Sequence, residues 1–128
     1  MSLAVLMVIA AALMGPLTAA LAKVGGPGFD NRAPRAWLEG LQGWRKRADW
    51  AQRNHYEVFA PFAAAVALAL AAGAKSEAVG LIAVGFVAAR VAYTGFYLAN
   101  LAALRSIAWT AGMIATMWIF VIAARAYG

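Results

Sequence analysis

The feature that most constrains this chain is a long apolar run without any charged residue near each of its ends. The first run extends from about Ser2 to Ala22, and the last from about Ser106 to Ala124. A helix of about 20 residues is long enough to cross the hydrocarbon core of a bilayer, so both runs predict membrane-spanning helices. A cleaved signal peptide is the alternative for the first run, but no basic stretch precedes it.

The composition agrees with a membrane protein and excludes several other classes. Hydrophobic residues make up 65% of the chain, against roughly 45–50% in soluble domains. Only 12% of the residues are charged, which is too few to cover a water-facing exterior. Cysteine is absent and His55 is the single histidine, so disulfides, thiolate chemistry and a histidine-built metal centre are not expected. We predict one integral membrane domain over residues 1–128, without a metal.

Two further apolar segments lie between these runs, which gives four predicted spans at about residues 2–22, 54–74, 78–101 and 106–124. The helix of the second span is expected to begin earlier, near Gly43, and a polar turn from Gly73 to Glu77 separates it from the third. No strand-like alternation is present. Because backbone polar groups in a bilayer must bond within the segment, the sequence predicts an all-α integral membrane four-helix bundle.

Most of the positive charge lies in the loop at residues 23–53. Its cationic residues are Lys23, Arg32, Arg35, Arg45, Lys46, Arg47 and Arg53. The net charge of +6 is therefore typical of a cytoplasmic loop rather than of a nucleic-acid partner. The positive-inside rule places this loop and the loop at residues 100–105 in the cytoplasm, with both termini outside. Within the loop, residues 30–35 predict a turn, because Asp30 bonds its own backbone and Pro34 fixes φ.

Polar residues recur at helical spacing in the middle of the chain. One set precedes and enters the second span, and the other lies in the third. They comprise Arg47, Trp50, Asn54, Glu57 and Pro61 in the first set, and Arg90, Tyr93, Tyr97 and Asn100 in the second. Spacing of three and four residues puts each set on one face of its helix. The two polar stripes are expected to face one another.

Charges inside a span are costly, so they mark function or pair with each other. One interpretation is that Glu57 and Arg90 form a buried ion pair that only fixes the register of the helices. For Tyr93 and Tyr97 the alternative to a functional role is packing, with their hydroxyls bonded to neighbouring groups. His55 lies off the stripe and is expected to be an ordinary interfacial residue.

The functional interpretation is a polar pocket near the cytoplasmic face. Its donors would be Arg47, Asn54, Arg90 and Arg105. Glu57 would accept from an ammonium group, and Tyr93 and Tyr97 would add hydroxyls. Such a pocket suits a small anionic molecule with one amine. The neighbouring spans would admit a lipophilic second substrate from the bilayer.

These stripes resemble the motifs of the MAPEG family, the membrane-associated proteins of eicosanoid and glutathione metabolism. Asn54-His-Tyr-Glu57, followed by Pro61-Phe62, resembles the family's Asn-x-x-Glu…Pro-Phe signature. The stretch from Arg90 to Tyr97, with Arg105 beyond it, resembles the Arg-x-x-Tyr-x-x-x-Tyr…Arg pattern. The likeness covers nearly the whole chain. The basic loop looks most like an uncharacterised bacterial branch, which together with the abundant alanine suggests a bacterial inner membrane.

The resemblance implies a homotrimer among membrane lipids, with glutathione bound between subunits near the cytoplasmic side. The glutathione-binding residues would be Arg47, Asn54, Glu57, Arg90, Tyr93 and Tyr97. Arg105 would be the catalytic residue that stabilises the glutathione thiolate, since a nearby guanidinium favours the charged sulfur. The thiolate would attack a lipophilic electrophile or reduce a lipid hydroperoxide, which makes the chain a transferase or peroxidase.

The chain also departs from the family pattern. Trp50 stands where glutathione-using members commonly have an arginine, and Val58 where an active relative has tyrosine. Successive residues of an α-helix lie about 100° apart around its axis, so Arg53 is displaced from the polar stripe. It is therefore not expected to substitute for the arginine that Trp50 replaces. These departures favour an alternative, a non-catalytic MAPEG-fold protein that acts as a structural subunit, a lipid-binding protein or a partner in a larger complex. A small transporter or channel is a third hypothesis, which rests on one buried carboxylate.

Overall fold

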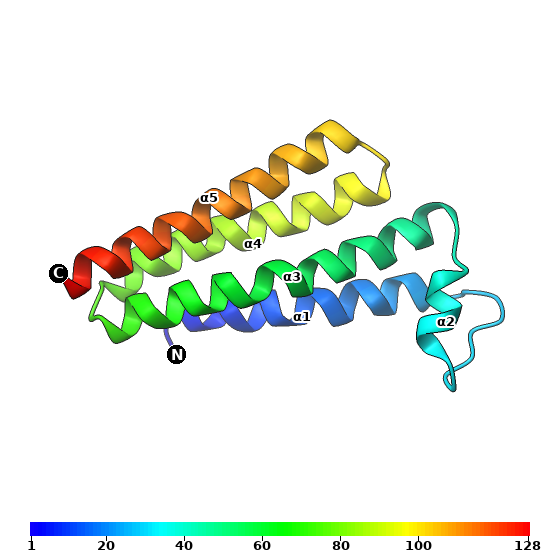
Figure 1. The fold of residues 1–128 in the computed structure, drawn as a ribbon, viewed down its shortest axis with the longest axis horizontal. Helices are drawn as coiled ribbons and strands as arrows, with labels where there is room; N and C mark the ends of the chain where they lie inside the picture. Colours follow the sequence, from blue (N-terminus) through cyan, green and yellow to red (C-terminus); the bar gives the residue numbers. More distant parts are fainter.

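The computed structural model describes all residues from 1 to 128 as five helices without a strand (Figure 1). The helices are α1 (Leu3–Lys23), α2 (Pro34–Glu39), α3 (Gly43–Ala71), α4 (Ser76–Leu98) and α5 (Ala102–Tyr127). The predicted all-α class is thus confirmed. The expected start of a helix near Gly43 and the turn after Gly73 agree with the observed bounds of α3 and α4.

The four long helices lie lengthwise beside one another. Helix α1 packs against α3 and α4, α5 packs against the same two helices, and α1 does not contact α5. Both termini and the turn between α3 and α4 lie at one end, whereas α2 and the turn between α4 and α5 lie at the other (Figure 1). The basic loop and the turn that precedes Arg105 therefore share one end of the molecule.

Three of the helices, α1, α4 and α5, are long and apolar enough to cross a membrane. They coincide with three of the four predicted spans, and such helices are typical of an integral membrane protein. Helix α3 differs because its first half carries the cations of the basic loop, while its second half, from Val58 onward, is free of charge.

Small side chains allow the helices to approach closely. Phe62 of α3 stacks on Phe86 of α4 with ring centroids 3.8 Å apart, and both lie in a core in which alanine is the most frequent residue. A Cβ atom on Gly80 would lie 3.2 Å from the backbone nitrogen of Ala4, so α1 and α4 nearly touch there. Small residues at contacts are typical of helix packing in membranes.

Residues in the left-handed conformation end two of the helices. Gly73 follows α3 with φ of 78°, and Asn100 follows α4 with φ of 61°. Asparagine tolerates this conformation, and the N–H of Leu101 donates to the carbonyl of Phe96 at 2.9 Å to close the helix end. The prediction that Asn100 continues the polar stripe of α4 is therefore wrong, because it lies beyond the helix.

The basic loop contains a short helix that the sequence did not indicate. The predicted turn is present, since Asp30 accepts a hydrogen bond from the backbone of Arg32 at 2.9 Å. Pro34 then begins α2 rather than only ending the turn, because its fixed φ suits the first position of a helix.

Candidate functional site

A chain of hydrogen bonds connects α4 with the polar stripe of α3. Arg90, which is 1% exposed, donates through Nη2 to Oδ1 of Asn54 at 2.9 Å. Asn54 donates in turn through Nδ2 to Oε2 of Glu57 at 3.0 Å. The carboxylate of Glu57 is exposed and is connected to Arg90 only through the amide of Asn54. A direct Glu57–Arg90 ion pair, the structural alternative above, is therefore not formed, and both ion pairs of the chain involve Asp49.

His55 is part of the same network. It is 3% exposed, and its Nδ1 accepts from Nε of Arg90 at 3.3 Å. Because a guanidinium only donates, Nδ1 must be the unprotonated nitrogen, and Nε2 then donates to Oγ1 of Thr94 at 2.8 Å. The hydroxyl of Thr94 in turn donates a hydrogen bond to the carbonyl of Arg90 at 3.0 Å. No buried side-chain nitrogen or oxygen lacks a partner.

The expectation that His55 is an ordinary interfacial residue is consequently wrong. The periodicity of the buried residues on α3 is the signal that places His55 on the core face. The buried residues Ala48, Gln52, His55, Val58 and Phe62 recur every three or four positions. They define the core face, which lies directly beside the polar stripe.

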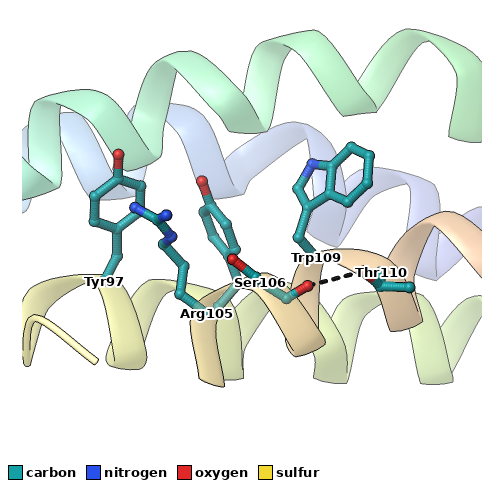
Figure 2. A pocket seen from close by; sticks show the side chains of 6 residues that line it. Tyr97, Arg105, Ser106, Trp109 and Thr110 are labelled. Carbon is teal, nitrogen blue, oxygen red and sulfur yellow. Dashed lines mark hydrogen bonds between the residues drawn. The ribbon is translucent and has the colours of Figure 1, made fainter. Parts of the chain in front are cut away.

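A first cavity of about 300 Å³ lies against α4 and α5 (Figure 2). It is lined by Tyr93, Tyr97, Arg105, Ser106, Trp109 and Thr110. The guanidinium of Arg105 lies over the ring of Tyr97, 4.6 Å from its centroid. No carboxylate or hydrogen-bond acceptor of the chain pairs with Arg105, so its donors remain free for a ligand.

A second cavity of about 510 Å³ adjoins the first. It is lined by Trp50, Arg53, Asn54, Glu57, Tyr93 and Tyr97. The two tyrosines line both cavities, and their rings meet edge to face with centroids 5.4 Å apart. The structure thus brings five of the seven predicted site residues to one continuous polar surface.

Arg47 and Arg90 do not line these cavities. Arg47 donates through Nε and Nη2 to the carbonyl of Leu98, at 3.1 and 2.9 Å. Its charge is placed at the C-terminus of α4, where unpaired carbonyls and the helix dipole favour a cation. Arg90 lies behind the cavities and is bonded to Asn54 and His55. Both residues support the structure around the site.

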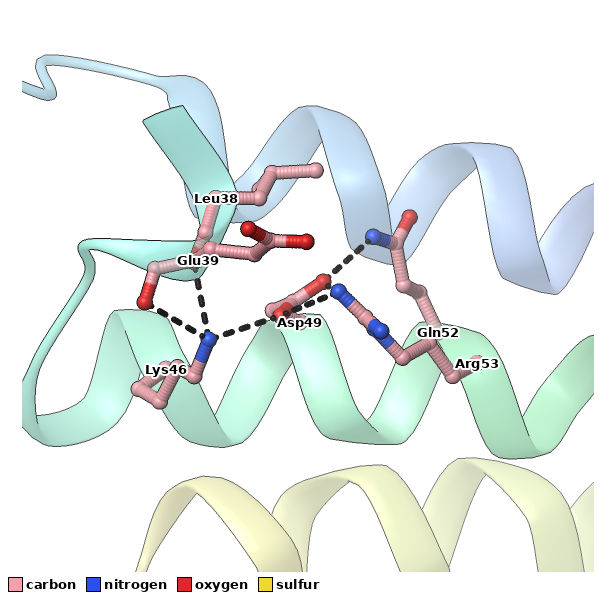
Figure 3. Close-up of polar contacts among 6 residues, drawn as sticks. All are labelled: Leu38, Glu39, Lys46, Asp49, Gln52 and Arg53. Carbon is pink, nitrogen blue, oxygen red and sulfur yellow. Dashed lines mark hydrogen bonds and ion pairs between the residues drawn. The ribbon is translucent and has the colours of Figure 1, made fainter. Parts of the chain in front are cut away.

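Arg53 lines the second cavity, contrary to the expectation that it points away from the polar stripe. The reason is that Arg53 lies four residues before Glu57, and four helical positions return to within about 40° of the same face. Asp49, one helical turn earlier, holds its guanidinium. The carboxylate of Asp49 is fully buried and accepts from Nε and Nη2 of Arg53 at 3.2 and 3.3 Å (Figure 3). This pairing holds the guanidinium beside Asp49, on the side of Arg53 that lies away from Glu57.

Asp49 also connects the site to the basic loop. It accepts hydrogen bonds from Nε2 of Gln52 at 2.9 Å and Nζ of Lys46 at 3.2 Å. Lys46 donates further to the carbonyls of Leu38 and Glu39 at the end of α2 (Figure 3). Burial alone would raise the pKa of Asp49, but the hydrogen bonds from Gln52, Arg53 and Lys46 outweigh it and hold the pKa below its ordinary value.

Comparison with known proteins gives one match. The family model described as MAPEG family matches residues 1–125 of the 128-residue chain. No curated protein and no solved structure matches the sequence. No group of three or more His, Cys, Asp and Glu side chains is placed to hold a metal ion.

Proposed function

The chain belongs to the MAPEG family, and on that premise we propose that it is a membrane-embedded transferase or peroxidase that uses glutathione. The observation that carries the proposal is the free guanidinium of Arg105 at the wall of a polar cavity. A buried or half-buried arginine is normally paired, and this one contacts only the ring of Tyr97. An anionic ligand group is the partner it lacks.

The chemistry of the two cavities fits the groups of glutathione. Glu57 keeps one carboxylate oxygen, Oε1, without a hydrogen bond, and it would accept from the ammonium of the tripeptide. Arg105 would lie beside the cysteine sulfur in the first cavity. Tyr93 and Tyr97, which line both cavities, would border the peptide between these ends. Arg47 and Arg90 would act indirectly, by fixing α4 and Asn54.

Arg105 would promote the reaction by favouring the thiolate, since a fixed positive charge stabilises the charged sulfur. In a transfer reaction the sulfur lone pair forms a bond to an electrophilic carbon, and the leaving group departs with its electron pair. In the peroxidase reaction the thiolate attacks the terminal oxygen of the hydroperoxide and the O–O bond breaks. The alkoxide leaves with the electron pair and takes a proton to become the alcohol, and the sulfur then carries the hydroxyl. A second glutathione then displaces the hydroxyl from sulfur, which gives glutathione disulfide, an alcohol and water.

We further propose that α3 is the fourth span and completes a four-helix bundle that assembles as a homotrimer. Its uncharged second half, from Val58 to Ala71, packs against three apolar helices. The cavities open at the surface of one subunit, where a neighbouring copy would close them. By the positive-inside rule, the end that carries α2 faces the cytoplasm of a bacterium and the termini face outward across the inner membrane.

Trp50 supports a second candidate, a non-catalytic membrane protein of the same family. Its indole lines the second cavity, with its ring 6.4 Å from the ring of Tyr97, and it carries no charge. Val58 is 8% exposed and packs in the core, so it supplies nothing to the cavity. A protein of this kind would bind lipid or a partner subunit at the same surface.

Purified protein in detergent micelles distinguishes the two candidates. Equilibrium dialysis measures glutathione binding, and product analysis follows conjugation of an aryl halide and reduction of a fatty-acid hydroperoxide. The proposal expects saturable binding and turnover, with turnover lost in Arg105→Gln. Binding without turnover, or the absence of both, favours the non-catalytic candidate. Arg125→Gln, at the far end of α5, is the matched control.

A further inference from the structure

Two opposite charges line the second cavity without pairing with each other. Arg53 and Glu57 lie one helical turn apart on α3, a spacing at which such residues commonly form an ion pair. Here Arg53 pairs with Asp49 on its other side, and Glu57 is held by Asn54. Each charge is therefore oriented by its own partner and remains available to the cavity that both residues line.

Arg53 keeps unused donors in this arrangement. A guanidinium has five N–H donors, and only one from Nε and one from Nη2 are directed to Asp49. Its side chain is 53% exposed, whereas that of Asp49 is 0% exposed. Because the carboxylate is held in the core, it fixes the guanidinium in place, and the side chain of Arg53 lines the cavity with N–H groups that no acceptor of the chain occupies.

The charge of Arg53 is also not cancelled locally. Asp49 is a single anion that contacts two cations, Lys46 and Arg53. The cluster therefore has a net positive charge beside the cavity, where Glu57 supplies the opposite sign. A ligand that neutralises both carries one anionic and one cationic group, and a carboxylate with an ammonium is such a pair.

We propose that Arg53 and Glu57 together bind an α-amino-acid group, with the carboxylate on Arg53 and the ammonium on Glu57. An α-amino acid carries both charges on one carbon atom, which matches two side chains on adjacent helical turns. This inference rests on the proposed function, because the γ-glutamyl end of glutathione is such a group. Arg53 then supplies the positive charge of this binding site, because Trp50 carries none.

Two analogues of glutathione, each lacking one charge, test this assignment on the full-length protein in detergent micelles. 4-Aminobutyryl-cysteinylglycine lacks the α-carboxylate, and glutaryl-cysteinylglycine lacks the ammonium. Calorimetric titration of the wild-type protein is expected to give affinities about tenfold to a hundredfold weaker for each analogue than for glutathione, as expected for loss of a charged hydrogen bond.

Substitutions then assign each charge to its residue. Arg53→Gln is expected to bind glutathione and the 4-aminobutyryl analogue equally, both at the weaker level, while it still discriminates against the glutaryl analogue. Glu57→Gln is expected to show the reverse selectivity. Arg32→Gln removes the same charge from the exposed loop and is expected to retain the wild-type preferences.

The outcomes separate this inference from the function on which it rests. If the wild-type protein binds none of the three peptides, the proposed use of glutathione is overturned, and this assignment with it. If it binds glutathione but Arg53→Gln retains the preference over the 4-aminobutyryl analogue, only the role of Arg53 is overturned. Should Arg53→Gln fail to fold, equal wild-type affinities for glutathione and that analogue would overturn the role without any substitution.

Discussion

Arg90 and Asn54 are joined across the contact between α4 and α3 by a hydrogen bond of 2.9 Å from Nη2 to Oδ1. Through this bond a buried cation on one helix sets the amide of a half-buried residue on another, and the amide directs the carboxylate of Glu57. The charge at the cavity is thus oriented by a core residue that the cavity does not reach. Residues that hold Arg90 therefore affect the site as well as stability.

The loss of stability on replacing His55 should depend on whether the new residue can accept a hydrogen bond from Arg90. His55→Leu leaves the guanidinium without its acceptor in the core, and an unpaired buried donor costs about 1–3 kcal/mol or more when charged. His55→Asn puts an amide oxygen near the position of Nδ1 and should lose clearly less. Unfolding titration in mixed detergent micelles measures both, and equal losses for the two variants would contradict the assigned role.

Acid should weaken the protein through Asp49. Since the folded state holds the pKa of this carboxyl below its ordinary value of 3.8, its contribution is full above that pH and is lost as the pH falls through the folded-state pKa. Asp49→Asn should therefore melt below the wild type at pH 7, and the difference should shrink as the pH falls below 3.8. Melting curves across this range test it, with Asp30→Asn as an exposed control. A difference that stays constant with pH would contradict the prediction.

Arg47→Gln should lower stability without altering the preference among ligands. Arg47 binds the carbonyl of Leu98 at the end of α4, and such a contact with a helix C-terminus is worth about 0.3–1 kcal/mol, up to ~2 when partly buried. Paired measurements of melting temperature and glutathione affinity check this. A large loss of affinity with unchanged melting would instead place Arg47 among the ligand-binding residues.

Gly80→Ala should destabilise the contact between α1 and α4. The added Cβ would lie 3.0 Å from Cβ of Leu3 and 3.2 Å from the backbone nitrogen of Ala4, and a backbone atom cannot move aside as a side chain does. Overpacking of this kind costs about 1–3 kcal/mol. Gly85→Ala, on the same helix with open space around it, is the control and should be neutral or stabilising. Equal stability of the two variants would contradict this prediction.

The fold was largely predictable from the sequence, and the reasons are local. The uncharged runs that form α1 and α5 can be assigned as helices without knowing what they pack against. In a bilayer the backbone groups of such a segment must bond within it, and a helix achieves this. The spacing that places Asn54 and Glu57 on one face, and Tyr93 and Tyr97 on another, follows from helical periodicity alone. These are the residues that the structure brings together at the cavities.

The remaining features depend on contacts between distant residues. Arg47 binds a carbonyl 51 positions away. The spacing of α3 places His55 on the core face, but its hydrogen-bond partners lie on α4, so the spacing shows the partners of neither residue. The guanidinium of Arg53 is held by the buried carboxylate of Asp49, and its backbone lies only about 40° around the helix from Glu57, so its side chain still lines the second cavity. A long side chain follows its partner, and periodicity predicts only where its backbone lies.

Titration of the glutathione thiol by its ultraviolet absorbance is the most direct test of the proposed site. The wild-type protein, saturated with glutathione in detergent micelles, should show a thiolate signal at neutral pH that free glutathione lacks, because the free guanidinium of Arg105 would stabilise the charged sulfur. Arg105→Gln should bind the tripeptide and lose that signal. A folded wild-type protein that binds glutathione with no thiolate at neutral pH, or an undiminished signal in Arg105→Gln, would contradict the proposed role of Arg105.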